Sequence, residues 1–169
     1  SLIAKCISAL PNVYLLSEVH PHSYRHLSES KSIFFPSDIA TLAHLARFPR
    51  AENLAVEIFR NSISQTYAHV ESYGGTLILR DHSHSDYCVG EETSEKSTVV
   101  NVLNDKFDIK SLVTIRNPID SFASLKSNYW LHFSPATFDE YCLRVLKFLK
   151  PYKHNQIIKY ESFVNSPIN

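Results

Sequence analysis

The sequence has no excess of charge of either sign and no long apolar run. Its 17 lysine and arginine residues balance 17 aspartate and glutamate residues, so the formal net charge at pH 7 is zero. A neutral chain has no overall field that draws it to nucleic acid or to an anionic membrane. All apolar runs are shorter than the roughly 20 residues that span a bilayer, and the first ten residues lack the layout of a signal peptide. The sequence therefore predicts no nucleic-acid partner and no membrane segment, and any anion site must be local.

Cysteine is scarce and methionine is absent. The three cysteines, Cys6, Cys88 and Cys142, show no C-x-x-C spacing and cannot all pair within one chain. This usage fits a reducing compartment better than secretion, so we expect a cytoplasmic protein. The missing methionine, together with a helical pattern that starts at Ser1, favours a fragment of a longer protein. The 169 residues suit a single domain, because chains of about 100–200 residues usually form one.

Helical and strand-like patterns alternate along the chain. The patterns predict strands over 13–16, 76–79, 112–115 and 156–159, and helices over 2–10, 37–48, 51–73, 97–104, 118–130 and 135–149. Residues 90–96, GEETSEK, have no core-forming period and are expected to form a surface loop. Because neighbouring parallel strands require a long return connection, the alternation predicts an α/β fold with a mainly parallel sheet.

Polar clusters follow three of the predicted strands. SEVHPH follows the strand at 13–16, RDHSHSD follows the strand at 76–79, and RNPIDS follows the strand at 112–115. Ligands of parallel α/β sheets bind outside the carboxyl ends of the strands. The three clusters are therefore candidates for a functional site.

The segment RNPIDSFAS combines features that favour an anion. Asn117 suits the N-cap of a helix and Pro118 suits its first position. The positive end of that helix and the planar donor fork of Arg116 would together favour a phosphate. Ser121 and Ser124 share one helix face with Asn117 and add hydroxyl donors.

Two other interpretations of the clusters stay open. Arg116 could be a surface arginine in an ion pair with Asp120. The histidines His20, His82 and His84, with His22 and Asp86 nearby, could instead hold a metal in a hydrolase or oxygenase, because H-x-H on a strand presents both imidazoles on one face.

Four segments resemble a known enzyme family. IRNPIDSFASL resembles the 3′-phosphate-binding element of sulfotransferases that use 3′-phosphoadenosine 5′-phosphosulfate (PAPS), in which a strand ends in Arg-(Asn/Asp)-Pro and a serine follows two turns later. TLILRDHSH resembles the family's strand that ends in a basic residue and a histidine. SLIAKCISALPNVYLLSE resembles the helix, turn and second strand after the family's phosphosulfate loop, and KYESFVNSP resembles its Lys/Arg-Tyr-Glu segment. The order of the segments matches along nearly the whole chain.

The resemblance implies a P-loop nucleoside-triphosphate-hydrolase-like fold, a three-layer α/β/α arrangement around a mainly parallel sheet. It implies that Arg116 and Ser124 bind the 3′-phosphate, with Ser121 also at the cofactor. The family's first strand and phosphosulfate loop would precede Ser1, which could be the last hydroxyl of that loop. The chain, residues 1–169, is therefore expected to be one incomplete sulfotransferase-like domain with a gap in its sheet. It is expected to bind PAPS poorly or not at all, and to be inactive, unless the parent protein supplies those segments.

The resemblance also implies a reaction, the transfer of a sulfuryl group from PAPS to a hydroxyl or amine of a small molecule or glycan. The product is 3′-phosphoadenosine 5′-phosphate (PAP), and no metal is required. His82 is implied as the base, with Arg80 near the leaving group. His84 is the rival base, because it would share a strand face with Arg80 and His82 if the strand continued past Leu79. Glu18 is a third candidate, more plausibly one that orients a basic side chain. A non-catalytic nucleotide-binding relative is the remaining alternative.

Overall fold

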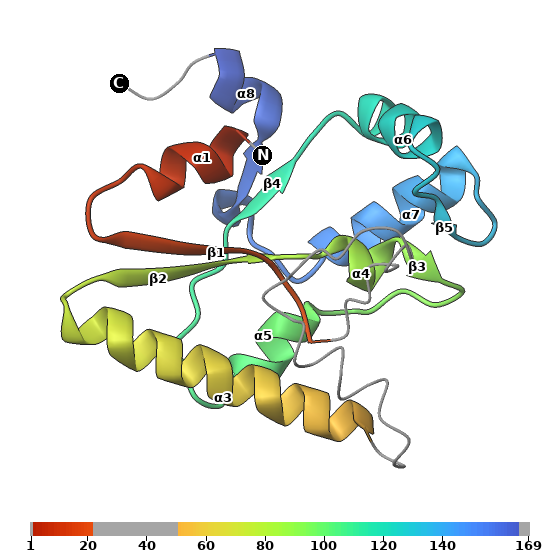
Figure 1. Ribbon diagram of the computed structural model, residues 1–169. Helices are drawn as coiled ribbons and strands as arrows, with labels where there is room; N and C mark the ends of the chain where they lie inside the picture. Colours follow the sequence, from red (N-terminus) through yellow and green to blue (C-terminus); the bar gives the residue numbers. More distant parts are fainter. Residues whose placement is uncertain (1, 22–50, 166–169) are drawn as a thin grey trace, which may run out of the picture. The chain divides into compact units, whose positions relative to one another are not determined.

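The computed structural model describes residues 2–21 and 51–165 of the chain. Ser1, His22 and the helix predicted over 37–48 lie outside the described residues. Contacts divide the chain into two compact units, Ser1–Ser85 and Asp86–Asn169. The described part is a mixed α/β structure in which all three strand pairs are parallel (Figure 1), which confirms the prediction of an α/β fold with parallel strand pairing.

The first unit contains a pair of parallel strands that end at the same edge. α1 (Leu2–Ser8) leads into β1 (Val13–Val19), which pairs with β2 (Thr76–Asp81) over its whole length (Figure 1). Both strands run past the apolar stretches that predicted them, because their polar ends continue the parallel pairing. Glu18 and Arg80 therefore belong to strands and not to loops.

The long helix α3 (Ala51–Ser72) precedes β2 and packs against it. Its buried residues recur at helical spacing and form one apolar stripe, made of Ala55, Phe59, Ile63 and Val70. The helix predicted over 51–73 is thus confirmed.

Two glycines end α3 where the sequence predicts. The N–H of Gly75 donates to the carbonyl of Val70 at 3.0 Å and the N–H of Gly74 donates to Glu71 at 2.8 Å, a Schellman motif. Gly74 has φ +69°, which glycine adopts without strain, and a Cβ at Gly75 would lie 2.6 Å from the ring of Tyr14. The glycines therefore fix the point at which the chain returns to the sheet.

The second unit contains two short parallel pairs. β4 (Val113–Ile115) pairs with β6 (Ile157–Lys159), and β3 (Val89–Gly90) pairs with β5 (His132–Phe133). The predicted strands at 112–115 and 156–159 are confirmed, each one residue shorter. The two-residue strands β3 and β5 were not predicted, because so short a run has no period.

The second unit also contains several helices. They are α5 (Thr98–Leu103), α6 (Pro118–Ser127), α7 (Phe138–Leu149), the 3₁₀ helix η1 (His154–Gln156) and α8 (Tyr160–Asn165). A four-residue helix that runs from the end of the first unit into the second, α4 (His84–Tyr87), was not predicted. Residues 91–97 have no helix or strand, so the predicted loop is confirmed except at Gly90, which ends β3.

An aromatic core holds α6 and α7 together. Phe122 of α6 packs against Phe138 and Tyr141 of α7, and Tyr141 stacks on Phe133 of β5. Cys88 is fully buried in the same cluster, and burial raises the pKa of its thiol to about 12. A thiol with so high a pKa stays protonated, so Cys88 acts as a core residue.

The described strands form three separate two-stranded sheets. The one continuous sheet expected from the alternation of strands and helices is therefore not present among these residues. No helix in the described ranges has both the length and the apolar character needed to cross a membrane.

Candidate functional site

The ends of β1 and β2 bring a glutamate and an arginine together. Nη1 of Arg80 donates to Oε1 of Glu18 at 3.0 Å and to Oγ of Ser17 at 2.8 Å. The two charged side chains are 36% and 33% exposed. Ion pairs with this exposure contribute only about 0–1 kcal/mol to stability. The pair therefore matters more for the orientation of Arg80 than for the stability of the fold.

Glu18 reaches Arg80 through an irregular step in β1. The register passes from Ser17 opposite Arg80 to Val19 opposite Asp81, so Glu18 is the extra residue of a β-bulge. Its φ is +60°, in the left-handed region that non-glycine residues adopt at a cost of roughly 1–2 kcal/mol. Strained residues of this kind concentrate at functional sites.

His82 and His84 lie next to each other beyond β2. The N–H of His82 donates to the carbonyl of Val19 at 3.1 Å, which extends the strand pairing by one residue. The strand does not continue to His84, which starts α4, because the N–H of Ser85 turns back to the carbonyl of His82 at 2.9 Å. The two half-buried rings nevertheless lie 6.1 Å apart at an angle of 44°. His82 and His84 therefore do not share a strand face, as the prediction for His84 required. Their rings are still neighbours.

His20 has a different environment from the other two histidines. It is only 2% exposed, and one of its ring nitrogens lies within 4.8 Å of a carboxylate oxygen of Asp81. Within the described ranges, His82 and His84 belong to no cluster of three or more potential metal ligands. The three histidines of the metal interpretation therefore do not converge on one point.

The second group of candidate residues lies in the other unit, at the end of β4. Oδ1 of Asn117 accepts from the N–H of Ile119 at 3.0 Å, and Pro118 is the first residue of α6. The predicted helix start is confirmed. Arg116, which links the strand to this cap, lies where a strand end and a helix N-terminus meet.

The guanidinium of Arg116 is exposed and makes no hydrogen bond or ion pair with any other described residue. Asp120 is also exposed, and no ion pair joins it to Arg116 among the described residues. The interpretation in which Asp120 occupies Arg116 therefore has no support in the geometry.

Glu161 also belongs to this group. It is the glutamate of the KYESFVNSP segment, for which the sequence predicted no role at the site. The N–H of Asn117 donates to Oε1 of Glu161 at 2.7 Å. That hydrogen bond is the main cause that lowers the pKa of the Glu161 carboxyl, and attraction from Arg116 and Lys159 lowers it further. The carboxylate is therefore ionised and close enough to Arg116 to feel its charge.

The two serines of α6 differ in their surroundings. Burial raises the pKa of Tyr141, and a hydrogen bond with the side chain of Ser121 opposes that rise, so Ser121 contacts the aromatic core. Ser124 is half-buried and uses its carbonyl to accept from Oγ of Ser127 and Nδ2 of Asn128. Its own hydroxyl has no bonding partner in the described part of the chain. Ser124 is thus the serine that remains available to a ligand.

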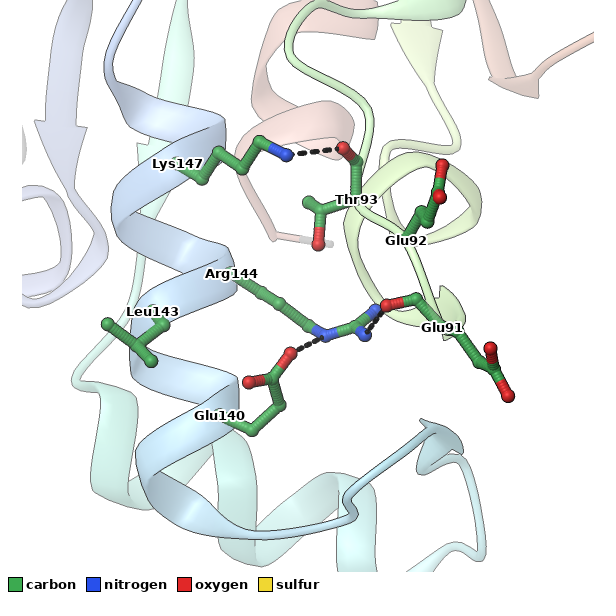
Figure 2. Close-up of a pocket in the computed structure, with 7 residues that line it drawn as sticks. All are labelled: Glu91, Glu92, Thr93, Glu140, Leu143, Arg144 and Lys147. Atoms are coloured by element: carbon green, nitrogen blue, oxygen red, sulfur yellow. Dashed lines mark hydrogen bonds and ion pairs between the residues drawn. The ribbon is translucent and has the colours of Figure 1, made fainter.

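A pocket of about 450 Å³ lies between α7 and the loop after β3 (Figure 2). Its lining contains none of the candidate residues; it consists of Glu91, Glu92, Thr93, Glu140, Leu143, Arg144 and Lys147. Nε of Arg144 donates to Glu140 at 2.6 Å, its Nη2 donates to the carbonyl of Glu91, and Nζ of Lys147 donates to that of Thr93 (Figure 2). Both cations already have protein partners, so the pocket is not the anion site.

The candidate residues thus form two groups, Glu18, Arg80, His82 and His84 in the first unit, and Arg116, Ser121 and Ser124 in the second. Comparisons of the chain with protein-family models, with curated proteins and with solved structures each found no significant match.

Proposed function

We propose that this protein is a PAPS-dependent sulfotransferase that transfers a sulfuryl group to a hydroxyl or amine of a small molecule or glycan. The observation that carries the proposal is Arg116, an exposed arginine at the end of a parallel strand and beside a capped helix start. Its guanidinium makes no hydrogen bond or ion pair with the described residues. An arginine fork with free donors next to helix amides suits a phosphate oxygen. Ser124, with its free hydroxyl, is proposed as the second ligand of the 3′-phosphate.

The proposed fold is the P-loop-like three-layer arrangement of that family. The parallel pairing of β1 with β2 and of β4 with β6 is compatible with it. Both clusters of candidate residues follow the carboxyl ends of parallel strands, where ligands of such sheets bind. Free thiols at Cys6, Cys88 and Cys142 fit the cytoplasmic location that we propose.

The first unit supplies the proposed acid–base and electrostatic groups. His82 takes the proton of the acceptor hydroxyl while the acceptor oxygen forms its bond to sulfur and the bond from sulfur to the bridging oxygen breaks. Arg80 stabilises the negative charge that develops on this bridging oxygen as PAP leaves. Glu18 holds the guanidinium of Arg80 in place through the contact at 3.0 Å. Side-chain chemistry of this kind needs no metal.

Titration calorimetry with PAP on the intact protein tests the anion site. Arg116→Ala should weaken PAP binding by about tenfold or more, because a charge-assisted hydrogen bond contributes roughly 1.5–3 kcal/mol. Lys126→Ala is the matched control, since it removes an exposed cation from the other end of α6. Equal affinities of the two variants would remove the basis of the proposal. PAP binding without sulfuryl transfer from PAPS would indicate a non-catalytic relative instead.

A further inference from the structure

We propose that Glu161 is a positioning residue for the anion site, because it completes the N-terminal cap of α6 and thereby holds Arg116 in place. The inference rests on the proposed function, which makes Arg116 a ligand of the 3′-phosphate. It adds a residue 45 positions further along the chain than Arg116, on a different strand-to-helix turn.

The cap of α6 uses a side chain from outside the helix. A capping box normally needs a Glu or Gln at the third helical position, whose side chain accepts from the N–H of the N-cap residue. Asp120 occupies that position here, and the N–H of Asn117 donates instead to Glu161 at 2.7 Å. Oδ1 of Asn117 in turn accepts from the N–H of Ile119, the second residue of α6. The cap therefore has one hydrogen bond made by Asn117 itself and one made by Glu161 of α8.

The strand register explains why Glu161 can reach this amide. Ile115 lies opposite Lys159 in the parallel pair of β4 and β6, so the two chains leave the sheet side by side. Two residues later on each strand, Asn117 and Glu161 form their hydrogen bond. The backbone of Arg116 is thus fixed on one side by the strand pair and on the other by Glu161.

The charge of Glu161 has an effect of its own. A carboxylate near Arg116 attracts the guanidinium, but it also repels a phosphate that approaches the same group. Glu161→Gln keeps an oxygen acceptor for the N–H of Asn117 and removes the charge, whereas Glu161→Ala removes both. The two variants therefore separate the hydrogen bond from the charge.

The experiment measures PAP affinity by calorimetry, together with hydrogen exchange of the Asn117 amide, in full-length wild-type protein and the variants. We expect Glu161→Ala to bind PAP about tenfold more weakly and to lose protection at Asn117, because the turn that carries Arg116 is released. Glu161→Gln should restore both properties to near the wild-type level. Asp120→Asn is the control, since it removes a carboxylate from the same helix start without touching the cap, and it should not weaken PAP binding.

Three results would overturn the inference. Tighter PAP binding by both Glu161 variants would show that Glu161 competes with the phosphate. Wild-type affinity in Glu161→Ala, with or without a lower melting temperature, would show that its role is only structural. If wild-type protein itself fails to bind PAP, the result contradicts the proposed function as well as this inference. The first two results are distinguishable from it, because in both of them wild-type protein binds PAP.

Discussion

Replacement of Arg144 by alanine should strongly destabilise the second unit. Arg144 is 1% exposed, and its guanidinium donates to the carboxylate of Glu140 and to the carbonyls of Tyr87 and Glu91. It also lies 4.9 Å from the ring centroid of Phe133. One side chain therefore connects α7 to the segment that runs from α4 into the loop after β3 (Figure 2).

The expected loss of unfolding free energy follows from the carboxylate of Glu140, which Arg144→Ala leaves without its partner. Removal of one partner of a buried ion pair costs about 3–5 kcal/mol, because the other charge stays without compensation. Glu140 retains 24% exposure of its side chain, so water recovers part of that loss and places the expectation near 3 kcal/mol. By contrast, Arg80→Ala removes an ion pair that is about one-third exposed and should cost about 1 kcal/mol or less.

Urea unfolding of the two variants measures the difference. We expect the urea concentration at the unfolding midpoint to fall far more for Arg144→Ala than for Arg80→Ala. The slope of the unfolding free energy against urea concentration should be similar in both variants. Arg144→Lys should recover only part of the loss, because an ammonium group lacks the planar fork that reaches three oxygens. Equal destabilisation by Arg144→Ala and Arg80→Ala would refute the reasoning from burial.

Two further predictions concern the candidate site. His82→Ala should reduce sulfuryl transfer by roughly 10²–10⁴ and leave PAP binding nearly intact, because general-base catalysis contributes about that factor, whereas His84→Ala should cost much less. The opposite ranking, measured by steady-state turnover, would assign the base to His84. The folded state lowers the pKa of Glu161 below its ordinary value of 4.5, so its stabilising contribution is complete above that value and is lost as the pH falls through the folded pKa. Acid titrations of stability should show this loss in wild-type protein and not in Glu161→Gln; parallel curves would contradict it.

Local signals in the sequence were reliable where one residue type decides the structure. Gly74 and Gly75 ended α3 because no other residue adopts these conformations without strain or collision. Asn117 and Pro118 started α6 because their side chains act on the adjacent turn. Such features need no information about distant parts of the chain.

Features that depend on distant partners were not predictable in the same way. The extension of β1 to Val19 depends on pairing with β2, more than fifty residues away. The segment KYESFVNSP resembles a family element, but the contact of Glu161 with Asn117 could not be predicted, because the two residues lie 44 positions apart. Arg144 lies in an amphipathic helix, where the sequence pattern predicts that a cation faces water. Its burial could not be predicted, because it depends on the distant carbonyls of Tyr87 and Glu91.

The most direct test of the central claim compares PAP with adenosine 5′-phosphate, which lacks the 3′-phosphate, on wild-type protein and on Arg116→Ala. If Arg116 binds the 3′-phosphate, calorimetry should show that wild-type protein prefers PAP by about tenfold or more, and that Arg116→Ala loses this preference while its affinity for adenosine 5′-phosphate is unchanged. The same preference for PAP in both proteins, or no preference in wild-type protein, would contradict the assignment of this site.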